Sequence, residues 1–170
     1  MKKILVVFSC LVVLGCNSKS EQKVEVEPVE LSAEVLKSDI AKLKYSDYSL
    51  DAKAEDALAA WDKYHALVST IEHLKSGDIS FFKNEAKELI TFIRELKTSM
   101  PEVVQTPAID ARILTLETKV LKLQSVLELQ NMPEAEQIQA IKEVLLAFSN
   151  LNLQINKKFE KETQNIAKPE

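Results

Sequence analysis

Apolar residues recur at alternating spacings of four and three positions over most of the chain beyond residue 50, as in amphipathic helices. This pattern predicts long helices over 50–75, 79–97, 107–130 and 134–162, and a short helix over 33–44. The residues expected to form the apolar faces are Leu36, Ile40, Leu43, Ala57, Trp61, Tyr64, Val68, Ile71, Phe82, Ala86, Leu89, Ile93, Leu96, Ile109, Ile113, Leu116, Val120, Leu123, Leu127, Ile138, Ile141, Leu145, Phe148, Leu151 and Ile155.

Turn residues mark the ends of these predicted helices. Gly77 suits the left-handed position after a helix, and Asp78 suits the N-cap of the next one. Thr106 followed by Pro107 is typical of an N-cap and the first helical residue. Pro133 separates the last two helices. The connections between the long helices are therefore expected to be short.

Long helices joined by short loops lie antiparallel to their neighbours, and a spacing near 3.5 residues favours shallow, left-handed packing. The sequence therefore predicts an all-α fold, an antiparallel up-down four-helix bundle with an additional short N-terminal helix laid across it. The bundle domain is expected over 32–163, with Ser32 as the first cap, followed by a frayed tail over 164–170.

The N-terminus has the parts of a bacterial secretion signal. Lys2 and Lys3 precede an apolar stretch over 4–14, which is too short to cross a bilayer, since that takes about 20 residues. The segment Val13–Cys16 resembles the lipobox of bacterial lipoproteins, with a branched residue, a small residue and a cysteine at the expected spacing. The resemblance implies that residues 1–15 are a signal peptide, removed before Cys16, and that Cys16 is acylated.

Two alternatives to this interpretation are less favoured. Cys10 also follows a small residue, Ser9, but its use would leave an apolar stretch of about six residues, below the usual range. An ordinary cleaved signal peptide or a stray apolar tail is the second alternative. We expect lipidation at Cys16.

An acylated Cys16 would hold the chain on a membrane, because each buried methylene adds about 0.8 kcal/mol and two or more chains bind stably. The lipidated N-terminus and a flexible tether are expected over 16–31, and the polar residues 17–30 would reach about 45–50 Å when fully extended. Asn17 stands where enterobacterial lipoproteins retained in the inner membrane have aspartate. We therefore expect the outer membrane and its periplasmic face, with cell-surface exposure as the alternative.

Charge and cysteine usage narrow the function classes. The formal net charge is −4, and loss of Lys2 and Lys3 with the signal peptide would take it to −6. A net negative charge argues against nucleic-acid partners and against binding to anionic lipid through a cluster of basic residues. The mature domain would hold no free cysteine, since Cys10 is removed and Cys16 is acylated. Thiol chemistry and cysteine-ligated metals are excluded on this interpretation.

The candidate catalytic and metal-binding residues are few. Asp62 and His65 share a helix face, but carboxylate di-metal bundles need a second Glu-x-x-His motif, and Thr70 stands three residues before His73. No haem motif and no nucleophile with a recognisable base and orienter is seen. We expect no metal, no cofactor and no enzymatic activity.

Apolar residues outside the main helix faces indicate a possible interaction surface. These residues are Phe81, Phe92, Leu114 and Leu121, although wide apolar faces are also typical of helices that bury more than two positions in seven. The leading hypothesis is a lipid-anchored envelope protein that binds another envelope protein, as adaptor, inhibitor or assembly factor. The alternative is a binder of an apolar small molecule between the helices.

The helical body carries one further resemblance. The segment 106–112, Thr-Pro-Ala-Ile-Asp-Ala-Arg, resembles short helical lipoproteins of Bacteroidota that have no assigned activity. It implies the same envelope location and no active site.

Overall fold

A computed structural model describes residues 33–129 and 131–164. This part of the chain is all-helical, with six α-helices, two 3₁₀ helices and no strand. The predicted signal peptide, Cys16 and the tether lie outside the described residues, as does most of the predicted C-terminal tail. Within the described ranges, no helix is long and apolar enough to cross a membrane.

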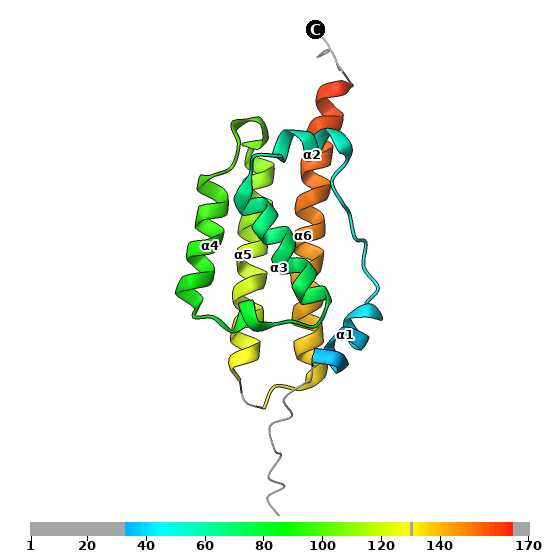
Figure 1. The fold of residues 1–170 in the computed structure, drawn as a ribbon, viewed down its shortest axis with the longest axis vertical. Coiled ribbons are helices and arrows are strands. Elements are labelled where there is room, and N and C mark those ends of the chain that lie inside the picture. Colours follow the sequence, from blue (N-terminus) through cyan, green and yellow to red (C-terminus); the bar gives the residue numbers. More distant parts are fainter. Residues whose placement is uncertain (1–32, 130, 165–170) are drawn as a thin grey trace, which may run out of the picture.

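The two longest helices form the centre of the fold. Helices α5 (Pro107–Glu128) and α6 (Glu134–Thr163) run side by side, and α4 (Ala86–Thr98) lies along the outer side of α5 (Figure 1). Helix α3 (Asp62–Lys75) crosses in front of α5 and α6 at an angle. The core between these helices is almost wholly apolar, and its fully buried members include Leu67, Ile71, Leu89, Ile113, Leu116 and Leu151.

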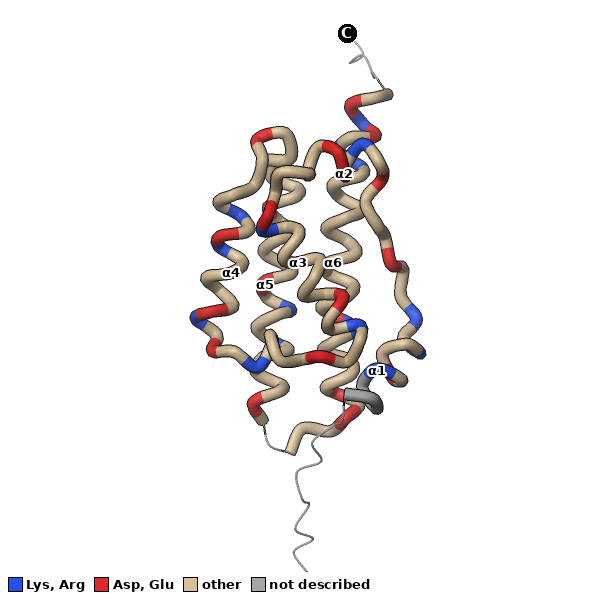
Figure 2. The backbone as a smooth tube through the Cα atoms, in the orientation of Figure 1, with Lys and Arg blue, Asp and Glu red and all other residues tan. Residues whose placement is uncertain are grey.

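Two short helices lie at opposite ends of α6. Helix α1 (Ala33–Ala41) packs near the beginning of α6, and α2 (Ala52–Leu58) packs near its other end. The extended segment 42–51 joins them and runs along α6 (Figure 1). Charged residues of both signs are interspersed along this segment and along α4 (Figure 2).

The prediction of one continuous helix over 50–75 is wrong, because the helix is interrupted between α2 and α3. Trp61 lies at the break and is only 1% exposed. Its indole Nε1 donates to the Leu96 carbonyl oxygen at 3.2 Å and lies 3.1 Å from the Ser99 hydroxyl oxygen, both at the end of α4. The interruption of the helix allows the Trp61 side chain to be buried and its Nε1–H to be hydrogen-bonded to the end of α4.

The predicted helix over 79–97 also begins differently. Residues Ser80–Lys83 form the 3₁₀ helix η1, and α4 starts only after Asn84, whose backbone is extended. Asp78 accepts a hydrogen bond from the Ser80 amide at 2.9 Å, so it caps this turn and not α4. The reason is packing, since η1 places Phe82 in the core at 1% exposure.

Several predicted helix ends are confirmed. Gly77 has a φ of 92°, the left-handed conformation expected after α3. Thr106 caps α5, its hydroxyl accepting from the Ile109 amide at 3.3 Å, and Pro107 is the first helical residue.

Three helices are shorter than predicted. Helix α1 ends at Ala41, three residues earlier than predicted. Helices α3 and α4, with 14 and 13 residues, are shorter than the predicted helices over 50–75 and 79–97.

Glu143 links the two central helices through an ion pair with two lysines. Its carboxylate lies 2.8 Å from Lys122 Nζ and 3.0 Å from Lys119 Nζ, both on α5. Hydrogen bonds from Lys122 and then Lys119 lower the pKa of Glu143 from 4.5 to about 2. Because the pKa is lower in the folded chain, these contacts stabilise the fold above about pH 4.5, and this contribution is lost as the pH falls toward 2.

The substitution Glu143→Gln should therefore lower the free energy of unfolding at pH 7 by about 1 kcal/mol, a modest value because solvent screens the partly exposed lysines. Urea denaturation between pH 7 and pH 3 should show this difference shrinking as the pH falls. Glu102→Gln, at an exposed position in η2 (Glu102–Val104), is the matched control and should show no such trend. A pH-independent difference for Glu143→Gln would contradict the assignment.

Candidate functional site

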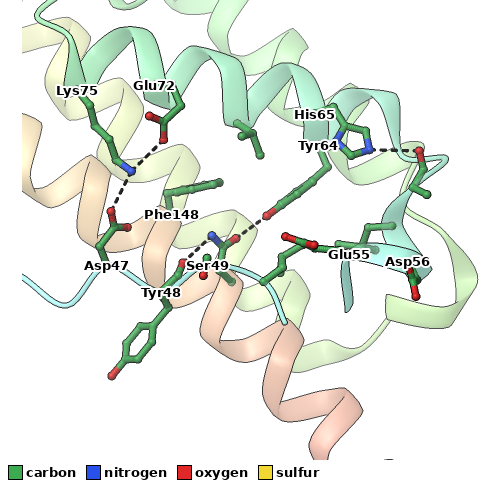
Figure 3. A pocket seen from close by; sticks show the side chains of 15 residues that line it. Asp47, Tyr48, Ser49, Glu55, Asp56, Tyr64, His65, Glu72, Lys75 and Phe148 are labelled. Carbon is green, nitrogen blue, oxygen red and sulfur yellow. Dashed lines mark hydrogen bonds and ion pairs between the residues drawn. The ribbon is translucent and has the colours of Figure 1, made fainter. Parts of the chain in front are cut away.

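A groove of about 770 Å³ lies between the extended residues 47–50 and helices α2, α3 and α6. Tyr64 and Phe148 point into its middle, Lys75 lies at one end, and Glu55 and His65 lie toward the other (Figure 3). The deepest side chains are closely packed, with Leu58 at 0% and Tyr64 at 3% exposure. The groove is thus a surface feature with a closed apolar floor and a charged rim.

One wall of the groove is the extended segment 46–51, which α6 holds by its backbone. The Ser149 hydroxyl donates to the Ser46 carbonyl oxygen at 2.6 Å and accepts from the Tyr48 amide at 2.8 Å. Asn152 Nδ2 donates to the Tyr48 carbonyl oxygen at 2.8 Å. Ser149 and Asn152 are three residues apart, so they share one face of α6.

Asn156 continues this row of polar side chains one turn further along α6. Its Nδ2 donates to the Ser49 carbonyl oxygen at 2.8 Å, and its Oδ1 accepts from the Asp51 amide at 3.0 Å. Asp51 in turn caps α2, accepting from the Ala54 amide at 2.8 Å. These backbone N–H and C=O groups are therefore hydrogen-bonded to side chains of α6, and they do not need water as a partner. Residues 46–51 thus keep a defined path.

Tyr64 supports the same arrangement from the floor. Its hydroxyl donates to Asn152 Oδ1 at 2.8 Å, and its ring stacks between Trp61 and Phe148 at centroid distances of 5.4 and 6.3 Å. Burial, with a smaller contribution from the negative charge of Glu55, raises the pKa of Tyr64 well above its ordinary value. The phenol therefore stays neutral and acts as a hydrogen-bond donor.

Lys75 closes one end of the groove. Its Nζ lies 2.9 Å from Asp47 Oδ2 and 3.0 Å from Glu72 Oε1, which ties the extended segment to α3. Partial burial disfavours the charged amine, but hydrogen bonds to Asp47 and Glu72 outweigh it and raise the pKa of Lys75. The lysine is therefore charged and already shared by two carboxylates of this chain.

The other end of the groove is acidic. Glu55 and Asp56 on α2 line it, and neither carboxylate is paired with a lysine or arginine in the described part of the chain. His65 Nε2 lies 3.2 Å from the Ala59 carbonyl oxygen, which orients the imidazole along the rim. Four carboxylates and one lysine line the groove, so its formal charge is negative with neutral histidine.

The structure does not gather the four predicted surface residues in one place. Phe81 and Phe92, both half-buried, meet edge-to-face at 5.1 Å beside a smaller hollow of about 490 Å³. Leu114 is 63% exposed and borders a shallow depression between α4 and α5, with Ile90 at 38%. Leu121 is half-buried against the core.

The candidate metal residues are also separate. His65 is on the groove rim, whereas His73 Nδ1 lies 4.0 Å from Asp78 Oδ2 at the end of α3. Across residues 33–129 and 131–164, no three His, Cys, Asp or Glu side chains are grouped as a metal site would need.

Sequence reasoning missed the groove. The available signal was the row of Ser149, Asn152 and Asn156 at helical spacing beside the apolar face of α6. Buried polar residues need partners, so this row pointed to a segment that packs on α6. Nothing in the sequence pattern identified residues 46–51 as that segment.

Comparison of the chain with protein-family models, with curated proteins and with solved structures found no significant match.

Proposed function

We propose that this chain is a lipid-anchored protein of the bacterial envelope that acts without catalysis, by binding another envelope protein as adaptor, inhibitor or assembly factor. The segment Val13–Cys16 supports acylation at Cys16, and the tether over 16–31 would let the helical domain reach away from the lipid. The outer membrane, with the domain on the periplasmic side, is the location we propose. Helices α3 to α6 would form an antiparallel up-down four-helix bundle that supports the binding surface.

The groove between residues 47–50 and α2, α3 and α6 is the observation that carries the binding function. Its floor is closed by packed side chains, and its rim offers exposed groups from three elements, Asp47, Glu55 and Glu72. Such a surface can accept a protruding side chain or an extended segment of another protein. The groove's imidazole, on His65, lies against the backbone carbonyl oxygen of Ala59, which favours binding over catalysis.

One observation favours the second candidate, a small-molecule binder. The groove volume of about 770 Å³ lies within the range of ligand pockets, and Leu50, Leu58 and Val68 give it an apolar side. Its rim is charged, however, so a wholly apolar ligand would leave four carboxylates partly desolvated. Native mass spectrometry of the purified protein would show a retained ligand as a discrete added mass.

Site-specific photo-crosslinking in intact cells tests the protein-binding proposal. A photoreactive residue at Ala59, which is exposed and lines the groove, should capture one dominant protein. The same probe at Ser125, exposed on α5 away from the groove, should not. The Cys16→Ser variant, which cannot be acylated, should leave the membrane fraction and lose most of this crosslink.

Equal capture at Ala59 and Ser125 would contradict the groove as the binding surface. Membrane retention of the Cys16→Ser protein would contradict the lipid anchor. These two results are independent, so the proposed membrane anchor and the proposed binding surface can be contradicted separately.

A further inference from the structure

We infer that the groove binds a basic segment of its partner protein, with a lysine or arginine side chain lying against Glu55. This inference rests on the proposed function, because it identifies the chemistry of the partner at the same groove. The partner side chain would enter beside α2, and an apolar neighbour would cover Val68 and Leu50.

Charge complementarity is the first argument. The only lysine of the groove lining, Lys75, is shared by Asp47 and Glu72, so these three groups together keep a formal charge of −1. Glu55 and Asp56 have no cationic partner among the described residues, so the larger share of the uncompensated negative charge lies at the α2 end. A carboxylate beside a low-dielectric wall attracts a cation more strongly than one fully in water.

The direction of the Glu55 side chain is the second argument. Figure 3 shows its carboxylate extending toward the middle of the groove, near Tyr64 and residues 47–50. The charge of Glu55 contributes to the raised pKa of Tyr64, which places the two groups within electrostatic reach. Glu55 therefore faces the space that a ligand would occupy.

The mixed lining is the third argument. Lysine and arginine carry an aliphatic stem as well as a charge, and the stem packs favourably on apolar surface while the charged end stays polar. The groove offers this combination, because Leu50, Val68 and Phe148 line it together with Glu55. A free inorganic cation would use the carboxylate and leave the apolar wall uncovered.

Two other occupants fit the charge less well. The chain's own tether, residues 17–31, holds four glutamates and two lysines, so it carries the same sign as the groove. An anionic membrane surface would be repelled for the same reason. A basic segment of another protein matches the negative charge of the groove and its partly apolar lining.

The test is a titration of the isotope-labelled protein with short synthetic peptides, followed by amide chemical shifts. The peptides share an alanine- and leucine-containing frame and differ only at one central residue, which is lysine, arginine, glutamine or glutamate. The lysine and arginine peptides should shift amides of residues 47–50 and 55–68 and bind several-fold more tightly than the glutamine peptide. The glutamate peptide should bind most weakly.

Substitution of Glu55 by glutamine tests the assigned contact. Glu55→Gln should weaken binding of the lysine peptide by about three- to fivefold, the effect of removing one partly exposed ion pair, and should leave the glutamine peptide unaffected. Glu102→Gln removes an exposed carboxylate far along the chain and should change neither affinity. Both substitutions are at exposed positions, so an unchanged circular dichroism spectrum establishes that the variants are folded.

The outcomes separate this inference from the function on which it rests. If all four peptides shift groove amides with equal affinity, or Glu55→Gln changes nothing, the basic partner is wrong while the groove remains a binding site. Shifts confined to residues outside the groove, or groove shifts caused by self-association of the protein alone, would also overturn the inference. If no peptide binds and the crosslink at Ala59 is absent as well, the proposed function fails too.

Discussion

Replacing Asn152 with alanine should lower the free energy of unfolding by about 2–4 kcal/mol. Asn152 lies on α6 and is 3% exposed. Its side-chain amide connects α6 to two other parts of the fold, because it accepts a hydrogen bond from the Tyr64 hydroxyl on α3 and donates one to the Tyr48 carbonyl oxygen in the extended segment. Truncation would remove both hydrogen bonds and leave the buried Tyr64 hydroxyl without an acceptor. An unsatisfied buried group costs more than the bond itself contributes, because its desolvation is no longer offset.

Urea denaturation followed by circular dichroism measures this effect. The matched control is Asn150→Ala on the same helix, since Asn150 is half-buried and its side chain makes no hydrogen bond within the described residues; a change within about 0.5 kcal/mol is expected. Amide exchange of residues 46–51 should also accelerate in Asn152→Ala and not in the control. Equal losses for the two variants would show that Asn152 does not hold the extended segment.

Replacing Trp61 with alanine should cost about 3–5 kcal/mol. The indole is 1% exposed, stacks on Tyr64, and donates to the carbonyl oxygen at Leu96. Alanine would leave a large cavity between α3 and α4 and would remove the indole hydrogen bond to the end of α4. Trp61→Phe should fill most of the space but lose the indole hydrogen bonds, so an intermediate cost of about 1–2 kcal/mol is expected.

Far-UV circular dichroism in urea is the suitable measurement, because Trp61 is the only tryptophan of the chain and its fluorescence is lost in both variants. Tyr48→Ala is the control for removal of an aromatic ring. The Tyr48 side chain is 40% exposed and points away from the groove, so a loss below about 0.5 kcal/mol is expected. A cost for Trp61→Ala as small as that of Tyr48→Ala would contradict the role of the indole at the helix break.

The break at Trp61 shows where helical periodicity is insufficient. Ala57, Trp61 and Tyr64 have the spacing of a single apolar helix face, and the sequence alone therefore predicts one helix through them. Periodicity depends on neighbours within one or two turns, and it reads the same when the chain bends and then resumes a helix. The deciding contact joins Trp61 to Leu96, which is 35 residues away.

The candidate surface residues illustrate the same limit. Phe81 and Phe92 are apolar residues off the main helix faces, and the structure places them together beside a hollow. Leu114 and Leu121 met the same sequence criterion but lie in other surroundings, one exposed and one packed on the core. Exposure of an apolar residue depends on what covers it, which a helical pattern does not specify.

By itself, the sequence determined the helical class, most of the buried positions of the long helices and several helix ends, including Gly77 and Thr106. These features depend on backbone preferences and on side chains a few residues apart, so local pattern is sufficient to predict them. Only the tertiary structure decided the path of residues 46–51 and the groove that they complete. The hydrogen bonds that hold this segment come from side chains of α6, between Ser149 and Asn156, and they join residues 101 to 107 positions apart in the sequence. Pairing over such a separation is set by the packing of the whole chain.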